Sequence, residues 1–583
     1  MPNLLAMSFE GELAPSFTLS CLAPGRTLPD GWGLGYYPAG EPSAAILKEP
    51  APPQASMRSQ LALAWEQVAS SMFVLHIRAA TWGARSDANT QPFSRTWGRR
   101  DWLMAHAGSL DRKPDTVAGP FEAVGSTDTE AIFCGLLNRF VERGWRNLAE
   151  ANLDELHGWL GEQNDRGELT LCLTDGRDLL LHADRRGAPL HLGILAPPYE
   201  KIAFGDDDLI VDLTRRGAKS RKGVIACTEP LAAADGGDAT HAVAWRQLAP
   251  GTLLVAREGA VIAERAGGGA IDTPRKRWGP ARAERQTYDV VHRTVYQYER
   301  PVERSKHTLR LVPVHDRLQS LRSSELTVSV PRSQEREYDD VFGNRVRRFE
   351  IDTPFTEMVI EARSVVEVHD VDPLGFGPLH VRSMIPLVWM PWQRQVLDPF
   401  LLPPELPETE LAELAEYAMT FVRRNDSDLL DTLLEINDTI YREYAYRPGT
   451  TTNLTTAFDT HVNRRGVCQD FANLMICLAR LLGVPARYVC GYVYTGPKPA
   501  DATGRERQGE ASHAWVQLYL PQVGWKGFDP TNGKLTQTEH VRVAVGRNRL
   551  DATPTAGTIF VGGGGETMSV DVRIEPHVPG AAS

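Results

Sequence analysis

Apolar positions alternate with polar ones in the middle of the chain and recur at helical intervals further on. Residues 287 to about 370 hold short alternating runs rich in Thr, Val and Tyr, separated by turn residues such as "DVFGN". Because alternation with period two is typical of half-buried strands, this stretch predicts an antiparallel β region. From about residue 407 the spacing becomes helical in "ETELAELAEYAMTFVRR" and "DLLDTLLEINDTIYREY", and strands follow in "ARYVCGYVY" and "SHAWVQLYL". The pattern in the last part of the chain therefore predicts a domain of helices followed by a sheet.

One segment breaks this patterning. Residues 264–286, "ERAGGGAIDTPRKRWGPARAERQ", are rich in Gly, Pro and charge and have no apolar periodicity, which is typical of a linker. A chain of 583 residues is long enough for about three or four domains. We therefore place the domain boundaries at 1–262, 263–286, 287–385 and 386–583, with the second range as the linker.

Composition and charge narrow the classes of function. The net charge of −11 argues against nucleic acid or an anionic membrane as the main partner. No apolar run reaches the length of a membrane span and no signal peptide is visible, so we expect a cytoplasmic protein. The seven cysteines lack paired metal-ligand spacing and no EF-hand loop is visible, so we expect reduced thiols and propose no metal and no cofactor. The sequence leaves the oligomeric state open.

The stretch "GVCQDFANLMICLARLLG" sets Cys468 at the start of an amphipathic helix. Phe471, Leu474, Met475, Leu478 and Leu482 form one apolar face, and the following Gly and Pro supply a stop. The first turn of a helix offers unpaired N–H groups and the positive end of the dipole, which favour a thiolate and can supply oxyanion donors. The competing interpretation is a small apolar residue at the start of a buried helix.

Two polar residues further along the chain complete a candidate triad. His513 falls at the start of an alternating strand in "SHAWVQLYL", and Asp529 lies beyond a turn, at the start or edge of the next strand. A thiol nucleophile needs a base, and the base needs an acceptor that fixes its tautomer. Taken singly, the histidine is explained as a core or edge residue and the aspartate as a turn former. Taken together with Cys468, they favour catalysis.

These residues carry a resemblance to the bacterial transglutaminase-like cysteine proteins. The similar segments are "RRGVCQDFANLMICLARLLGVPARYVCGYV", "SHAWVQLYLPQVGWKGFDPTN" and "HVRVAVGRN", preceded by the β-rich "YDVVHRTVYQYERPVERSKHTLRLVPV". The resemblance implies a papain-like core with Cys468 as nucleophile, His513 as general base and Asp529 as orienter. It also implies an acyl-thioester intermediate, with water or an amine as the acceptor. Gln517 stands where many relatives carry Glu, and we infer nothing from that difference.

The first half of the chain resembles a class II glutamine amidotransferase domain, through "MPNLLAMSFEG", "DGWGLGYYPAG", "FVLHIRAATWG", "WLMAHAGSL" and "GSTDTEAIFCGLL". The resemblance implies an N-terminal-nucleophile αββα sandwich whose catalytic cysteine follows the initiator Met. Here that position is Pro2, which offers no thiol. The family's "HNG", whose Asn helps to hold the oxyanion, reads "HAG" with Ala107. The loss of one such donor costs about 2.7 to 4 kcal/mol of transition-state stabilisation in other enzymes.

The ligand-binding positions of that family persist. Arg78, Gly108 and Asp128 match its contacts to the α-carboxylate and α-amine of glutamine, and we hold ligand binding and inherited scaffolding as equal alternatives. Cys21 is internal and lacks a free amine, so we give it little weight as a replacement thiol. An exposed Pro2 acting as a secondary-amine catalyst is chemically allowed, but we prefer loss of function.

We therefore expect an α+β multidomain chain: an αββα sandwich, an antiparallel β domain and a papain-like transglutaminase core. The leading hypothesis is a thiol-dependent amide or isopeptide hydrolase or acyl transferase, which acts on a peptide, protein or γ-glutamyl-type substrate. The amidotransferase domain would then be inactive and serve recognition or scaffolding. The alternatives are a binding or assembly protein in which both domains are inert, and a residual glutamine amidotransferase.

Overall fold

The computed structural model divides the chain into two compact units, Met1–Arg277 and Trp278–Ser583, which are described separately. The structure describes all residues except 1–2, 21–27, 39–41, 54–57, 59–67, 80, 82, 113, 115–117, 200, 207, 215–219, 234–242, 267–268, 272–284, 370–382, 453, 497–511, 522 and 579–583. Pro2 and Cys21 therefore lie outside the described residues, as does most of the segment expected to be a linker.

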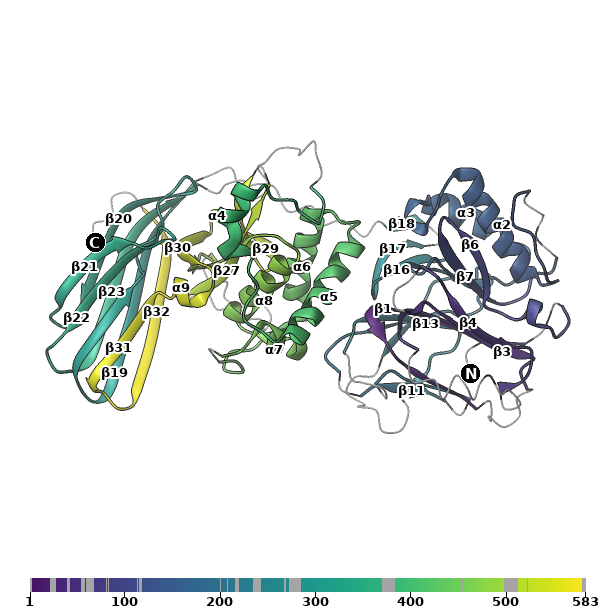
Figure 1. Ribbon diagram of the computed structural model, residues 1–583, viewed down its shortest axis with the longest axis horizontal. Helices are drawn as coiled ribbons and strands as arrows, with labels where there is room; N and C mark the ends of the chain where they lie inside the picture. The colour runs from purple at the N-terminus through teal and green to yellow at the C-terminus, as the bar shows by residue number, and fades with distance from the viewer. Residues whose placement is uncertain are drawn as a thin grey trace. The chain divides into compact units, whose positions relative to one another are not determined.

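Two seven-stranded sheets form the centre of the first unit (Figure 1). The strands of one sheet, in spatial order, are β15 Ala244–Gln247, β10 His191–Leu195, β13 Gly223–Cys227, β1 Leu4–Leu13, β5 Ser70–Arg78, β3 Gly31–Tyr36 and β4 Ala45–Glu49. Those of the other are β18 Gly269–Ile271, β17 Ala260–Ala266, β16 Leu253–Arg257, β9 Asp178–His182, β8 Thr170–Thr174, β7 Arg100–Ala107 and β6 Phe93–Trp97. Buried residues of both sheets share one core, which includes Ala6, Val74, Ala105 and Leu181.

The outer faces of the two sheets are covered differently. Helices α2 Asp128–Arg143 and α3 Leu153–Asn164 pack on the β7 sheet through a cluster that includes Trp102 and Phe140, whose rings lie 4.9 Å apart. Residues of the β1 sheet pack with a four-stranded sheet of β14 Ala232–Ala233, β11 Ala203–Gly205, β12 Leu209–Asp212 and β2 Ser16–Leu19. The short helices η3 Asp87–Asn89 and η4 Leu148–Glu150 lie in connections. The sheet that contains β17 and β18 continues past residue 262, into the range expected to be a linker.

The β part of the second unit is organised around one long strand. Strand β19 Gln286–Leu309 pairs with β23 Phe355–Val368 and β22 Arg345–Ile351, and the outer strands are β20 Gln319–Val328 and β21 Ser333–Asp339. It also pairs with β31 Thr555–Gly562 and β32 Glu566–Pro576, as Figure 1 shows. Residues 555–576, which the boundary at 386–583 assigns to the core, therefore extend the sheet of the β region. The strand pairing shows this, because Val290 of β19 lies opposite Ile574 of β32 on one side and opposite Ser364 of β23 on the other.

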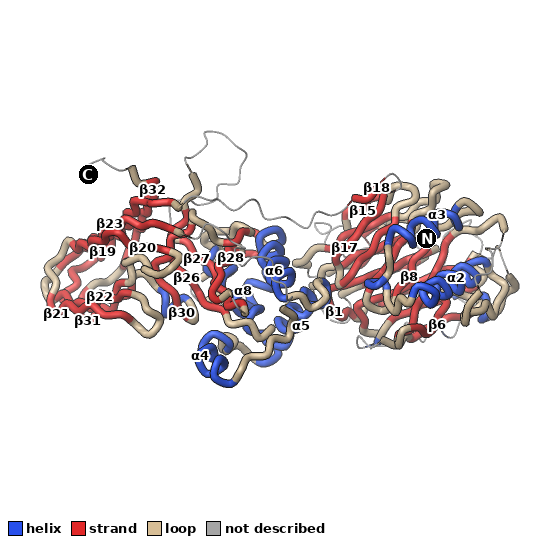
Figure 2. Tube along the Cα trace, turned by 90° about the horizontal axis from the view of Figure 1, so that it is seen from above, coloured by secondary structure: helices blue, strands red, loops and turns tan. Residues whose placement is uncertain are grey.

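The core of the second unit combines helices with a five-stranded sheet (Figure 2). Its helices are α4 Pro391–Leu401, α5 Glu408–Arg424, α6 Leu429–Glu443, α7 Ala457–Asn463, α8 Cys468–Leu481 and α9 Arg549–Ala552. The sheet order is β29 Lys534–Leu535, β28 Gly524–Asp529, β27 His513–Leu520, β26 Ala486–Val493 and β30 His540–Gly546, and β24 Ala445–Tyr446 pairs with β25 Arg465–Gly466. The mixed α and β content confirms the expected fold class.

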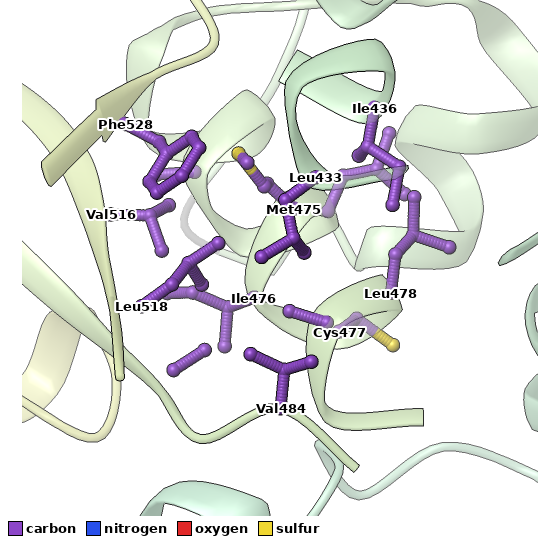
Figure 3. Packing of buried hydrophobic residues seen from close by; sticks show 14 of the residues in the cluster. Leu433, Ile436, Met475, Ile476, Cys477, Leu478, Val484, Val516, Leu518 and Phe528 are labelled. Carbon is purple, nitrogen blue, oxygen red and sulfur yellow. The ribbon is translucent and has the colours of Figure 1, made fainter. Parts of the chain in front are cut away.

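Helix α8 lies at the centre of this core. Met475 and Leu478 are fully buried and belong to one cluster with side chains of the sheet, such as Val516 and Phe528, and with Leu433 of α6 (Figure 3). Burial of a large aliphatic side chain contributes about 1.5 to 3 kcal/mol, so this packing fixes the helix against the strands. The first residue of the helix is thereby held at a defined position relative to the sheet.

None of the helices in the described part of the chain has the length and apolar character that a membrane span requires.

Candidate active site

Cys468 is the first residue of α8, and local interactions make the helix begin there. Val467, the N-cap, has an extended backbone, and its N–H donates to Asp470 Oδ2 at 2.8 Å. Asp470 thus caps the residue before the thiol, and the helix begins at Cys468. The thiol is half-buried. The first N–H groups of a helix have no intrahelical partner, so the backbone at Cys468 and Gln469 can donate to an anion.

Strand register brings His513 next to Asp529. His513 is the first residue of β27 and Asp529 is the last residue of β28, and these strands pair antiparallel with Val516 opposite Phe528. Because the strands are antiparallel, the start of one lies beside the end of the other. The sequence placed Asp529 at the start or edge of its strand; the structure places it at the strand's end, on the far side from the hairpin turn.

The imidazole and the carboxylate are hydrogen-bonded. His513 Nε2 donates to Asp529 Oδ2 at 3.0 Å, and the Asp529 side chain is completely buried. The other carboxylate oxygen accepts from the backbone N–H groups of Thr531 and Asn532, at 3.1 and 3.2 Å. Asn532 Nδ2 also donates to Oδ2 at 2.7 Å. These donors hold the carboxylate in one orientation, and that orientation fixes His513.

Charge pairing perturbs both groups. Burial alone would lower the pKa of His513, but the Asp529 carboxylate and the Cys468 side chain, which is hydrogen-bonded to the imidazole, raise it to about 10. Burial would raise the pKa of Asp529, but His513 and His540 hold it well below the usual range of a carboxyl. The imidazole is therefore stabilised as a cation between the Asp529 carboxylate and the Cys468 side chain.

One aromatic side chain contacts both this imidazole and a second one. Trp515 is fully buried and stacks on His513, with ring centroids 5.9 Å apart, and its edge contact with His540 measures 5.2 Å. His540 Nε2 lies 3.2 Å from Asp529 Oδ2. The Asp529 carboxylate therefore contacts both imidazoles, those of His513 and His540.

The first unit holds a polar pocket that gathers the three predicted binding residues, Arg78, Gly108 and Asp128, together with Ala107. Asp128, at the start of α2, accepts from the N–H groups of Leu110 at 2.9 Å and Thr129 at 2.8 Å. Other residues that line the pocket are His76, Gln91, His106 and Thr129.

Hydrogen bonds set the shape of this pocket. Arg78 is buried and donates to the backbone carbonyl oxygens of Gly83 at 3.0 Å and Ala84 at 3.3 Å.

Two histidines that line the pocket, His76 and His106, are buried, and burial lowers the pKa of both, that of His76 to about 3. The two imidazoles are therefore neutral near pH 7 and the pocket's charge comes from its other residues.

Comparison with protein families assigns both units. The model for class-II glutamine amidotransferases matches residues 1–277, that for the bacterial transglutaminase-like N-terminal region matches 288–367, and that for the transglutaminase-like superfamily matches 415–530. The chain joins a class-II glutamine amidotransferase domain to a transglutaminase-like core. Membership in the transglutaminase-like superfamily supports a thiol-dependent enzyme.

Similar proteins cover one half of the chain or the other. An uncharacterized protein of Mycobacterium leprae is 30% identical over 288 residues, which are 49% of this chain and 97% of that protein. The structure of a "predicted glutamine amidotransferase" from Pseudomonas aeruginosa is 26% identical and covers 45% of this chain and 99% of its own, with a TM-score of 0.35. The periplasmic domain of TgpA from the same organism is 16% identical, with 41% and 87% covered and a TM-score of 0.23.

The amidotransferase domain constrains its "HAG" segment closely. A Cβ added to Gly108 would lie 2.5 Å from the Glu168 carbonyl oxygen, and its φ of +136° is one that other residues rarely adopt. His106 is held by Thr129 at 3.0 Å and by the same Glu168 carbonyl at 3.0 Å. The segment therefore keeps a tightly specified backbone, while Ala107 between these residues has no polar side-chain group.

Among the described thiols of the chain, Cys468 differs from the others in exposure. Cys134, Cys172, Cys227, Cys477 and Cys490 are buried, whereas Cys468 is half-exposed. Burial raises the pKa of all five, to about 12 for each except Cys134. These five are therefore poor nucleophiles at neutral pH.

Sequence reasoning missed Asn532 and His540 in the transglutaminase-like core. Asn532 stands in the turn "DPTNG" and His540 in the strand "HVRVAVG", where each is explained by local structure alone. A lone His at a strand start carries no signal of its own, because its partner becomes visible only in the folded sheet. In the described parts of the chain, His, Cys, Asp and Glu side chains form no group of three or more that could hold a metal ion.

Proposed function

We propose that the transglutaminase-like core is a thiol-dependent amide or isopeptide acyl hydrolase or acyl transferase, with Cys468 as nucleophile, His513 as general acid–base and Asp529 as orienter. The observation that carries the proposal is the chain of contacts from the half-exposed thiol to a largely buried imidazole and on to a buried carboxylate. The joint placement of these three residue types at one end of α8 and of the sheet matches what covalent thiol catalysis needs.

In the acylation step, the Cys468 thiolate bonds to the carbonyl carbon of the substrate amide, and the carbonyl π electrons move to oxygen. The backbone N–H groups at the start of α8 can donate to that oxyanion. The C–N bond then breaks, the amine leaves with the proton of the His513 imidazolium, and a thioester remains. Nε2 is engaged by Asp529, so Nδ1 is the ring nitrogen available to the thiol and the leaving group.

In the deacylation step, water or a primary amine loses a proton to the neutral imidazole as its oxygen or nitrogen attacks the thioester carbon. The C–S bond breaks, the thiolate–imidazolium pair returns, and a carboxylic acid or a new amide is released. Hydrolysis and transfer to an amine use the same protein groups, Cys468, His513 and Asp529. Which acceptor reacts depends on how well the site excludes water and binds the amine.

The direct test uses the full-length protein with a panel of glutaminyl, γ-glutamyl and ordinary peptide amides, with and without a primary amine. We expect release of ammonia or amine that Cys468→Ala abolishes and that Cys490→Ala, a change at a buried thiol, leaves in place. Mass spectrometry distinguishes a hydrolysed product from an amine adduct. Turnover that survives Cys468→Ala would overturn the proposal, and so would a full panel without turnover or a thioester adduct.

We further propose that the amidotransferase domain is inactive in glutamine hydrolysis but binds a glutamine- or γ-glutamyl-like group. The pocket that gathers Arg78, Gly108 and Asp128 supports it, because a guanidinium and a carboxylate in one pocket suit a zwitterionic amino-acid group. Pro2 and Ala107 remove the thiol and the oxyanion donor that the family uses. Inherited scaffolding is the competing explanation, and titration with glutamine and γ-glutamyl peptides separates the two.

A further inference from the structure

His540 makes a contact with the candidate triad that the three named residues do not explain. It is the first residue of β30, only 3% exposed, and β30 is separated from β28 by β26 and β27 in the sheet. Nevertheless its Nε2 lies 3.2 Å from Oδ2 of Asp529, the same oxygen that accepts from His513 at 3.0 Å. A second imidazole on one catalytic carboxylate oxygen calls for a role.

The geometry defines the tautomer of His540. A carboxylate oxygen can only accept, so the proton lies on Nε2 and points at Asp529. Nδ1 is buried and has no hydrogen-bond partner among the described residues. The Nε2–H tautomer leaves no proton on Nδ1, so no buried donor is unsatisfied. His540 is thus arranged to donate one hydrogen bond to Asp529.

The remaining contacts of Asp529 do not replace this bond. Oδ1 accepts from two backbone N–H groups, and Asn532 Nδ2 donates to Oδ2 at 2.7 Å while lying 3.5 Å from His513 Nε2. Asn532 therefore approaches from the side of His513. His540 reaches the same oxygen past the edge of Trp515 and belongs to a different strand. Its titratable hydrogen-bond partner is Asp529, and His513 bonds to the same carboxylate oxygen.

We propose that His540 is a positioning residue of the thiol site. Its Nε2–H holds Oδ2 of Asp529 in the orientation that aligns His513 with Cys468. Without this donor Oδ2 keeps Asn532 and His513 as its partners, so the carboxylate is held less tightly and aligns the imidazole with Cys468 less well. This inference rests on the proposed function of the core, because positioning has meaning only if Cys468 is the nucleophile.

The test compares His540→Gln with His540→Met in the full-length protein. Both side chains are unbranched and similar in size, but only Gln carries an N–H donor. The matched control is His292→Met, because His292 is also buried, at 2% exposure, and is bonded to Tyr492 and Thr294 instead of Asp529. The readouts are the pH profile of Cys468 alkylation, the His513 titration by NMR with labelled histidine, and the melting temperature.

We expect His540→Met to slow Cys468 alkylation at pH 7 by about tenfold, equivalent to ~1.4 kcal/mol, and to move the acid limb of the profile to higher pH. The pKa of His513 should fall at the same time. His540→Gln should restore most of the rate, and His292→Met should lower the melting temperature without moving the profile. Equal profiles for the Gln and Met variants, or the same displacement in His292→Met, would overturn the inference.

A measurement on the unsubstituted protein covers the case in which the Met variant does not fold. The Nε2–H protons of His513 and His540 should both give downfield, exchange-protected resonances that disappear in Asp529→Ala. A His540 resonance unaffected by that change would overturn the inference. The two proposals fail separately: an unreactive Cys468 contradicts the proposed function, whereas a reactive Cys468 that needs His513 but not the His540 donor contradicts the positioning role alone.

Discussion

Replacement of Asp529 by Asn should abolish the proposed thiolate–imidazolium pair while it preserves the shape of the site. The pKa of His513 is about 10, because the carboxylate at 3.0 Å and the Cys468 side chain outweigh the effect of burial. Relative to the ordinary histidine value of 6.5, this corresponds to a net preference of ~5 kcal/mol for the imidazolium, after the opposing effect of burial. A neutral amide no longer offsets burial by its charge, so we expect the pKa of His513 to fall in Asp529→Asn.

The sign of the pH dependence follows from the raised pKa. A histidine whose pKa is raised on folding contributes stability that is fully present below about pH 6.5 and is lost as the pH rises through about 10. The unsubstituted protein thus keeps the imidazolium across neutral pH, and the variant loses it there. We expect Cys468 alkylation at pH 7.5 to slow by about tenfold or more, since the thiolate loses its cation.

The assay is alkylation by iodoacetamide between pH 5 and 10, followed by mass spectrometry of the Cys468 peptide, with NMR titration of His513 alongside. Asp551→Asn is the matched control, because Asp551 accepts from Arg547 at 2.8 Å and lies in the same core without contacting the triad. If Asp529→Asn keeps the alkylation profile and the His513 titration of the unsubstituted protein, the reasoning from charge pairing is wrong.

Four further outcomes are expected. Limiting iodoacetamide near neutral pH should label Cys468 before the buried Cys490, and preferential labelling of the buried thiol in peptide maps would count against a catalytic Cys468. The Cys468→Ala protein should release no ammonia from glutamine in a coupled assay; turnover that disappears on Arg78→Ala would show the amidotransferase domain to be active. Glutamine or a γ-glutamyl peptide at 100 times its dissociation constant should stabilise the protein by about 2.7 kcal/mol in calorimetry, and a gain that survives Arg78→Ala with Asp128→Ala would rule out this pocket. Gly108→Ala should cost ~1 to 3 kcal/mol in denaturant unfolding, because its φ is +136° and the new Cβ would meet a carbonyl oxygen at 2.5 Å; unchanged stability would contradict that steric argument.

Much of the core could be predicted from local pattern. Apolar spacing and the Gly483 stop indicated a helix from Cys468, and α8 runs from Cys468 to Leu481. The alternation after His513 indicated β27, which begins at that residue. These features depend on residues close in sequence, so periodicity is enough to locate them.

Other features depend on contacts between distant segments. The sequence analysis did not assign β31 and β32 to the β region, because their partner β19 lies more than two hundred residues earlier. For the same reason His540 gave no signal, since its role depends on Asp529 in another strand. The pocket in the amidotransferase domain was indicated only through resemblance, because Arg78, Gly108 and Asp128 come from separate elements.

The return of β31 and β32 to β19 affects how this protein is synthesised. Strand β19 leaves the ribosome before the entire thiol core has been made, yet two of its pairing segments, Thr555–Gly562 and Glu566–Pro576, follow that core. The sheet cannot be completed co-translationally until residue 576 has emerged, and non-local pairing of this kind raises contact order and slows folding. Until then β19 presents unpaired backbone groups, which are a template for association with other chains. A nascent chain stalled within the core thus exposes one edge of β19, and the last two strands cover that edge.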